Sequence, residues 1–91
     1  MKRKRDRLEV IYDILSTISA KSGTIKPTHI LYKSNLSHSM MEEYMEELLE
    51  KGFIEQAEHK GSRTYVITPK GLEYLQKYKF IKEFVESFGL N

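Results

Sequence analysis

The first part of the chain places its hydrophobic residues at helical intervals. A recurrence of three or four positions, with polar residues between, predicts an amphipathic helix over about residues 8–22. Its apolar positions are Leu8, Ile11, Ile14, Leu15 and Ile18. Asp6 followed by Glu9 has the pattern of a capping box, and Gly23 is suited to end the helix.

Two further helical segments follow, separated by a tight turn. Pro27 suits the first turn of a short second helix, which Ile30 and Leu31 anchor. The run Ser34-Asn35-Leu36-Ser37 predicts the turn, because Asn tolerates a left-handed backbone and Ser37 can cap the next helix. The third helix is predicted from about His38 to Lys51, and its apolar stripe is Met41, Met45, Leu48 and Leu49.

After Gly52 the pattern changes to that of extended strands. Residues 53–58 and 64–67 predict two strands, and the polar, glycine-containing residues 59–63 predict the hairpin tip. Thr68-Pro69 is typical of a helix entry, and the final helix continues to about Phe88. The order helix, helix, turn, helix, hairpin, helix predicts a mainly α fold with a small β-hairpin.

Composition and charge narrow the class of protein. The 91 residues suit a single domain, 40% of them are hydrophobic, and the chain has no cysteine for disulfides or thiolate metal sites. Residues 1–7 have five basic residues against one acidic residue, a net charge of +4, whereas the remaining chain has −2. This basic N-terminal arm either neutralises phosphates or is a solvated tail. We expect neither a secretory signal nor a membrane span, and therefore a cytoplasmic protein.

Four stretches of the chain carry a resemblance to a known family. They are residues 26–32, residues 35–37, residues 44–54 and residues 65–71 with Leu75, and together they cover most of residues 8–76. In their order and spacing they resemble archaeal winged helix-turn-helix DNA-binding proteins, including the small chromatin-associated type that dimerises through a C-terminal coiled coil. The resemblance implies a nucleoid-associated protein or transcription regulator that binds double-stranded DNA as a dimer. It divides the chain into an arm (1–7), a winged helix-turn-helix domain (8–68) and a dimerisation helix (69–91).

The resemblance makes the third helix the recognition helix and the hairpin tip the wing. The first turn of a recognition helix meets base edges in the major groove, which selects Ser37, His38, Ser39 and Glu42. For the two serines and His38, simple capping or surface exposure is the alternative. The basic candidates for phosphate contacts are Lys2, Arg3, Lys4, Arg5, Lys26, Lys33, Lys60 and Arg63. His29 is a further candidate, at a position where the family often has Arg.

The third helix also carries charge that opposes DNA binding. Its acidic residues are Glu42, Glu43, Glu46, Glu47 and Glu50. Carboxylates repel phosphates, so either only the first turn enters the groove or the acidic face binds a protein partner.

The final helix has a heptad seam. Tyr74, Tyr78, Ile81, Val85 and Phe88 are spaced by four and three residues, and Phe80 and Phe84 widen the seam. Leu72 and Leu75 lie on another side and are expected to pack on the core. The seam favours a homodimer. The alternative is that the final helix folds back on the first helix and buries Val10 and Tyr12 there.

Other chemistry finds little support in the residues. His29, His38 and His59 have no ligand spacing, so we expect no metal. Because no nucleophile motif and no glycine-rich phosphate loop occurs either, we expect no cofactor and no enzymatic activity.

Overall fold

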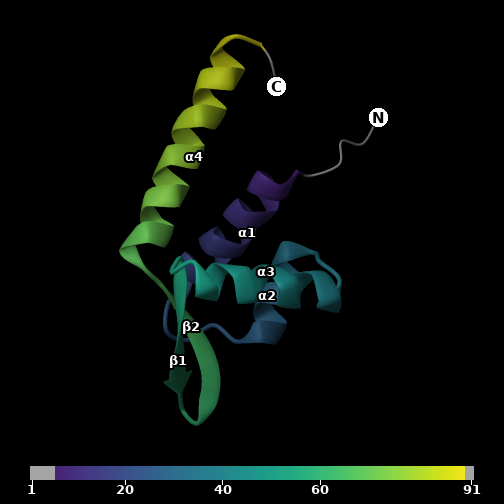
Figure 1. Ribbon diagram of the computed structural model, residues 1–91, viewed down its shortest axis with the longest axis vertical. Helices are drawn as coiled ribbons and strands as arrows, with labels where there is room; N and C mark the ends of the chain where they lie inside the picture. Colours follow the sequence, from purple (N-terminus) through teal and green to yellow (C-terminus); the bar gives the residue numbers. More distant parts are fainter. Residues whose placement is uncertain (1–5, 90–91) are drawn as a thin grey trace.

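The computed structural model describes residues 6–89, which form four helices and one two-stranded antiparallel hairpin that projects from the helices at one end (Figure 1). The elements in chain order are α1 (Arg7–Ala20), α2 (Pro27–Ser34), α3 (His38–Glu50), β1 (Ile54–His59), β2 (Ser62–Ile67) and α4 (Pro69–Ser87). The predicted mainly α fold with a small hairpin is confirmed.

Local side-chain chemistry starts three of these helices where the sequence predicts. The side chains of Asp6, Ser37 and Thr68 accept hydrogen bonds from backbone N–H groups three residues later, at 2.8, 3.3 and 3.1 Å. Each bond satisfies an N–H that has no partner within its helix. Asn35 adopts the left-handed conformation (φ 52°) that ends α2 and turns the chain into α3.

The hairpin is tighter than predicted. Its register pairs Ile54 with Ile67 and His59 with Ser62. Only Lys60 and Gly61 lie between the strands, both with positive φ (50° and 79°), as a type I′ turn requires. The predicted five-residue tip was therefore wrong, because the turn chemistry of Lys60-Gly61 lets both strands continue to the loop.

The core lies where α1, α2, α3 and the hairpin meet. Its buried hydrophobic residues are Val10, Ile11, Ile14, Leu15, Ile18, Ile25, Ile30, Met41, Met45, Leu48, Ile54 and Tyr65. These include the apolar positions that the helical spacing selects in α1 and α3, except two. Leu8 is 54% exposed and Leu49 is half-buried. Ile25, in the loop before α2, also forms an isolated bridge with Tyr65 of β2 and so ties the helical part to the hairpin.

Helix α4 divides into a packed and a projecting part. Its first half lies against α1: the Tyr74 hydroxyl donates to the Leu8 carbonyl oxygen at 2.8 Å, and the rings of Tyr78 and Tyr12 stack with centroids 4.6 Å apart. Burial at this contact raises the pKa of Tyr74 to about 12. The second half extends away from the hairpin, past α1 (Figure 1).

The projecting part leaves large apolar side chains exposed. They are Phe80, Ile81, Phe84 and Phe88, between 61% and 77% exposed. Leu75 packs against the core, as predicted, but Leu72 is 44% exposed. Within residues 6–89, no helix has both the length and the apolar character needed to cross a membrane.

Candidate nucleic-acid interface

The first turn of α3 is open to solvent. Ser37, His38, Ser39 and Glu42 are all exposed. The Ser37 hydroxyl oxygen accepts from the Met40 N–H, so this serine acts as a cap whether or not it also contacts DNA. His38 Nδ1 lies 3.5 Å from a Glu42 carboxylate oxygen, which gives the histidine a carboxylate neighbour at the helix start.

The wing places two cations near its tip. Lys60 is in the turn and Arg63 is in β2, and both are exposed. The register sets Arg63 directly opposite Glu58, so one of the two cations has an acidic cross-strand neighbour. Sequence reasoning missed Glu58, although a two-residue turn at Lys60-Gly61 would have fixed this pairing.

A third group of candidates lies on α2. Lys26, His29 and Lys33 are three and four residues apart and therefore share one helix face. All three line an open hollow of about 490 Å³, which Lys21 and Tyr32 also line. Sequence reasoning missed both of these residues: Lys21 joins the group because the loop after α1 folds back beside α2. The candidates Lys2, Arg3, Lys4 and Arg5 lie outside the described residues.

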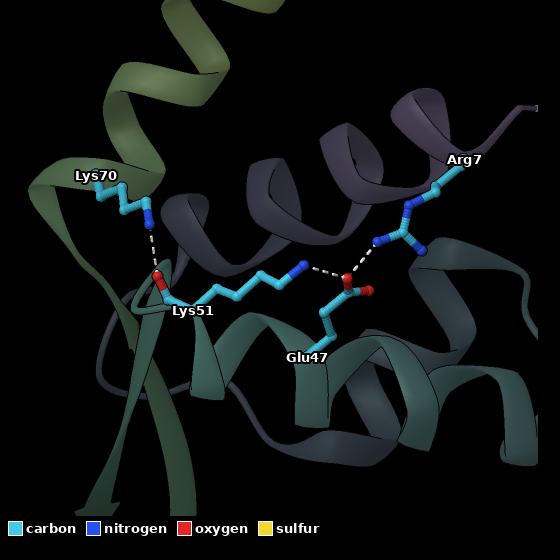
Figure 2. Close-up of polar contacts among 4 residues, drawn as sticks. All are labelled: Arg7, Glu47, Lys51 and Lys70. Carbon is cyan, nitrogen blue, oxygen red and sulfur yellow. Dashed lines mark hydrogen bonds and ion pairs between the residues drawn. The ribbon is translucent and has the colours of Figure 1, made fainter.

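One of the five glutamates on α3 is neutralised within the chain. Glu47 accepts hydrogen bonds from Arg7 of α1 and from Lys51, whose Nζ is 2.9 Å away (Figure 2). These bonds lower the pKa of Glu47 to about 2. The Arg7 guanidinium also lies over the Tyr44 ring, 5.7 Å from its centroid. Arg7, which the charge count assigned to the basic arm, thus has a structural partner.

Lys51 and Lys70 connect this ion-pair cluster to α4. Lys70 Nζ donates to the Lys51 carbonyl oxygen at 2.7 Å (Figure 2) and lies 4.6 Å from the centroid of the Phe53 ring. Two basic residues near the wing's base are therefore occupied by contacts within the chain. The other four glutamates of α3 remain exposed on its solvent face.

The ion pairs of Glu47 predict a pH-dependent stability. Because the pKa of Glu47 is lowered from 4.5 to about 2, its ionised form is favoured in the folded state. Its contribution is complete above about pH 5 and is lost as the pH falls from 4.5 towards 2. We expect Glu47→Gln to lower the melting temperature at pH 6–7 but not near pH 2, as measured by circular dichroism. Glu46→Gln is the matched control on the same helix, and an equal loss for Glu47→Gln at both pH values would contradict the prediction.

Three helices, a basic-tipped hairpin after the third, and a capped, exposed start of that third helix define a winged helix-turn-helix domain. The family model described as winged helix-turn-helix matches residues 4–86, and the chain belongs to this family.

A relative and three solved structures are similar to the chain. An uncharacterized protein of Methanocaldococcus jannaschii, MJ0290, is 35% identical over 74 residues, which are 81% of this chain and 32% of that protein. The chain therefore spans about a third of the length of this relative.

The solved structures share the fold at low identity. The DNA-binding protein Sso10a-2 from Sulfolobus solfataricus has a TM-score of 0.76 and 21% identity, over 93% of this chain and 87% of that one. SSV1 F-93 has a TM-score of 0.71 and 18% identity, over 97% and 99%. The type III plasmid segregation protein TubR has a TM-score of 0.61 and 15% identity, over 87% and 90%.

Within residues 6–89, no group of three or more histidine, aspartate or glutamate side chains is placed to hold a metal ion.

Proposed function

We propose that this domain binds double-stranded DNA, with the first turn of α3 in the major groove and the wing on the adjacent backbone. The observation that carries the proposal is the open start of α3, where His38 and Ser39 are exposed on a helix that a side chain caps. A helix end of this kind fits the major groove and attracts phosphates through its N–H groups. The similarity in fold to Sso10a-2, described as a DNA-binding protein, supports the same function.

The acidic residues of α3 restrict how the helix can dock. Glu43, Glu46 and Glu50 follow the first turn on its solvent face and are exposed. They would meet phosphates if the whole helix lay along the groove, and the repulsion would weaken binding. The domain therefore docks by the N-terminal end of α3, with Lys60 and Arg63 holding the backbone beside it. Contacts from Lys2 to Arg5 in the minor groove are part of the same proposal.

The proposed assembly is a homodimer that acts as a transcription regulator or chromatin-associated protein on the nucleoid. Phe80, Ile81, Phe84 and Phe88 form the exposed apolar face of α4. Covering this face with the same face of a second copy would bury it, and a two-fold dimer presents two recognition helices to two half-sites. Tyr74 and Tyr78, which the heptad pattern placed in the dimer seam, contact α1 of their own chain. Val85, the remaining seam residue, is half-buried.

Fluorescence anisotropy with a labelled duplex of mixed sequence tests DNA binding. We expect affinity that falls steeply between low and physiological salt, because phosphate contacts release counterions. Replacing Lys60 and Arg63 with Gln should reduce the slope of log K against log salt by about 2, at about 0.9 for each phosphate contact. Lys77→Gln with Lys79→Gln removes the same charge from α4 as a control. Absence of binding even at low salt would refute the proposal.

A second candidate function rests on the four exposed glutamates of α3. In this case α3 binds a basic protein partner, and the domain has negligible affinity for DNA. Glu46→Lys separates the two functions: it raises the affinity for the duplex if α3 faces DNA, whereas it removes an attractive charge if α3 faces a basic protein.

A further inference from the structure

A cationic hollow lies beside the exposed face of α2. The proposed docking of α3 and the wing on DNA does not involve this hollow. The hollow has a volume of about 490 Å³ and is lined by Lys21, Thr24, Lys26, Thr28, His29, Tyr32 and Lys33. A neighbouring hollow of about 290 Å³ shares Lys21, His29 and Lys33 with it. The larger volume falls within the range of sites that take small ligands, about 300–1,000 Å³.

The charge of this region is one-sided. No carboxylate is among the described residues that line the larger hollow, and in the sequence no acidic residue occurs between Asp13 and Glu42. Elsewhere in the described domain several basic residues pair with acids, as Lys51 does with Glu47 and Lys77 with Glu73. Three lysines converging without a counter-charge produce a positive potential that an anion can neutralise.

The remaining lining groups suit a phosphate ester. Thr24 donates its hydroxyl hydrogen to the Lys21 carbonyl oxygen at 3.1 Å, which fixes the loop that brings Lys21 to α2. Lys26, Thr28 and His29, at the start of α2, line the same hollow. Tyr32 is 83% exposed at its edge, where its ring can stack on a base or pack on a sugar.

We infer that this hollow is a phosphate-binding site in which Lys21, Lys26 and Lys33 hold the anion and Tyr32 contacts the group attached to it. Two sources offer this chemistry: the backbone of a bound duplex and a free nucleotide. With the duplex as the source, the inference deepens the proposed DNA binding and rests on it, and Lys21 and Tyr32 extend the interface beyond α3 and the wing. With a free nucleotide as the source, the site is independent of DNA.

The experiment follows backbone amide shifts of the ¹⁵N-labelled protein by NMR at low salt. Three probes are titrated separately: inorganic pyrophosphate, ATP and an unlabelled duplex of mixed sequence. The variant carries Lys21→Gln, Lys26→Gln and Lys33→Gln. The control carries Lys77→Gln, Lys79→Gln and Lys82→Gln, which removes three charges from α4 and so leaves the net charge equal to that of the variant.

We expect pyrophosphate and ATP to shift the amide resonances of residues 21–33 in a saturable way. The variant with Lys21, Lys26 and Lys33 replaced (the α2 variant) should lose these shifts, and the α4 control should keep them. If the duplex moves the same amides, the α2 variant should also reduce the salt slope of duplex binding by about 2–3, and DNA is the source. If the duplex moves only α3 and wing amides, or does not bind, the free nucleotide is the source.

Two results would overturn the inference. One is that none of the three probes moves the amides of residues 21–33, even where the duplex binds at α3 and the wing. The other is that the α4 control loses the shifts as fully as the α2 variant, because the response would then reflect net charge alone. Failure of DNA binding with intact pyrophosphate shifts would count against the proposed function and leave the phosphate site standing.

Discussion

Gly71→Ala is expected to lower the melting temperature of the domain by about 4–24 °C. Overpacking costs about 1–3 kcal/mol, and each kcal/mol shifts the midpoint of a domain this size by about 4–8 °C. An alanine Cβ at this buried position would lie 2.4 Å from the Phe53 carbonyl oxygen and 2.6 Å from Cγ1 of Ile67. The Ile67 side chain can rotate, but the Phe53 carbonyl is backbone and also accepts hydrogen bonds from the Thr68 N–H and hydroxyl. The helix propensity gained from alanine, about 1 kcal/mol, matches only the lower end of this cost. The short distance to a backbone oxygen places Gly71→Ala towards the upper end, so the net effect is destabilising.

Gly52→Ala is the matched control for this prediction. Gly52, unlike Gly71, has a positive φ (79°), and a Cβ there would meet nothing within 4 Å. Its cost comes from the left-handed backbone alone, about 1–2 kcal/mol. Thermal unfolding followed by circular dichroism compares the two variants. A Gly71→Ala protein that melts at the wild-type temperature, while Gly52→Ala shows its backbone cost, would show that the close approach of α4 to Phe53 is not required for stability.

The contacts around Gly71 also set the direction in which α4 leaves the domain. The Thr68 hydroxyl lies 2.7 Å from the Gly52 carbonyl oxygen and 2.9 Å from that of Phe53, and it caps α4 through the Gly71 N–H. The start of α4 is therefore held against the loop between α3 and β1. Because a helix is stiff, a small change of angle here would move the apolar face near Phe84, about 20 Å further along.

Local chemistry accounts for the parts of the fold that the sequence predicts well. The caps Asp6, Ser37 and Thr68 act within three residues of themselves, and the helical spacing of α1 reports directly which face is buried. The error at the hairpin tip was also local. The prediction placed His59, Ser62 and Arg63 in the loop, whereas the two-residue turn at Lys60-Gly61 leaves them in the strands.

Contacts between distant residues account for what the sequence could not predict. Arg7 and Glu47 are 40 positions apart, and only the packing of α1 on α3 brings the two charges together. The same limit hid the cationic hollow, because Lys21 and Lys33 belong to different elements and meet only when the loop between α1 and α2 folds back. Residue type identified Lys26, His29 and Lys33 as candidates, but their common cavity is a tertiary property.

The heptad pattern of α4 shows the limit most clearly. Its period correctly marks an apolar face, but it does not say which neighbour each residue packs against. Tyr74 and Tyr78 pack against α1 of the same chain: Tyr74 donates a hydrogen bond to the Leu8 carbonyl oxygen, and the ring of Tyr78 stacks on that of Tyr12. Beyond Tyr78 no element of the described chain reaches the apolar face, so Phe80, Ile81, Phe84 and Phe88 are exposed. The first part of α4 is therefore folded back on α1. For the rest of the helix, pairing with a second copy remains our proposal.

Phe80→Ser with Phe84→Ser is expected to convert a homodimer into a monomer of 10.7 kDa. The two side chains are 77% and 63% exposed in the single chain. Full burial of such a side chain is worth about 1.5–3 kcal/mol, and a two-fold interface buries each of them in both copies. Sedimentation equilibrium over a range of concentrations measures the mass of the wild type and the variant, and circular dichroism confirms that the variant is folded. Met40→Ser with Leu72→Ser is the control, because it removes two apolar side chains that are each 44% exposed elsewhere and should leave the dimer intact. A wild type at the monomer mass throughout, or a double serine variant that still dimerises, would rule out this face of α4 as the dimer contact.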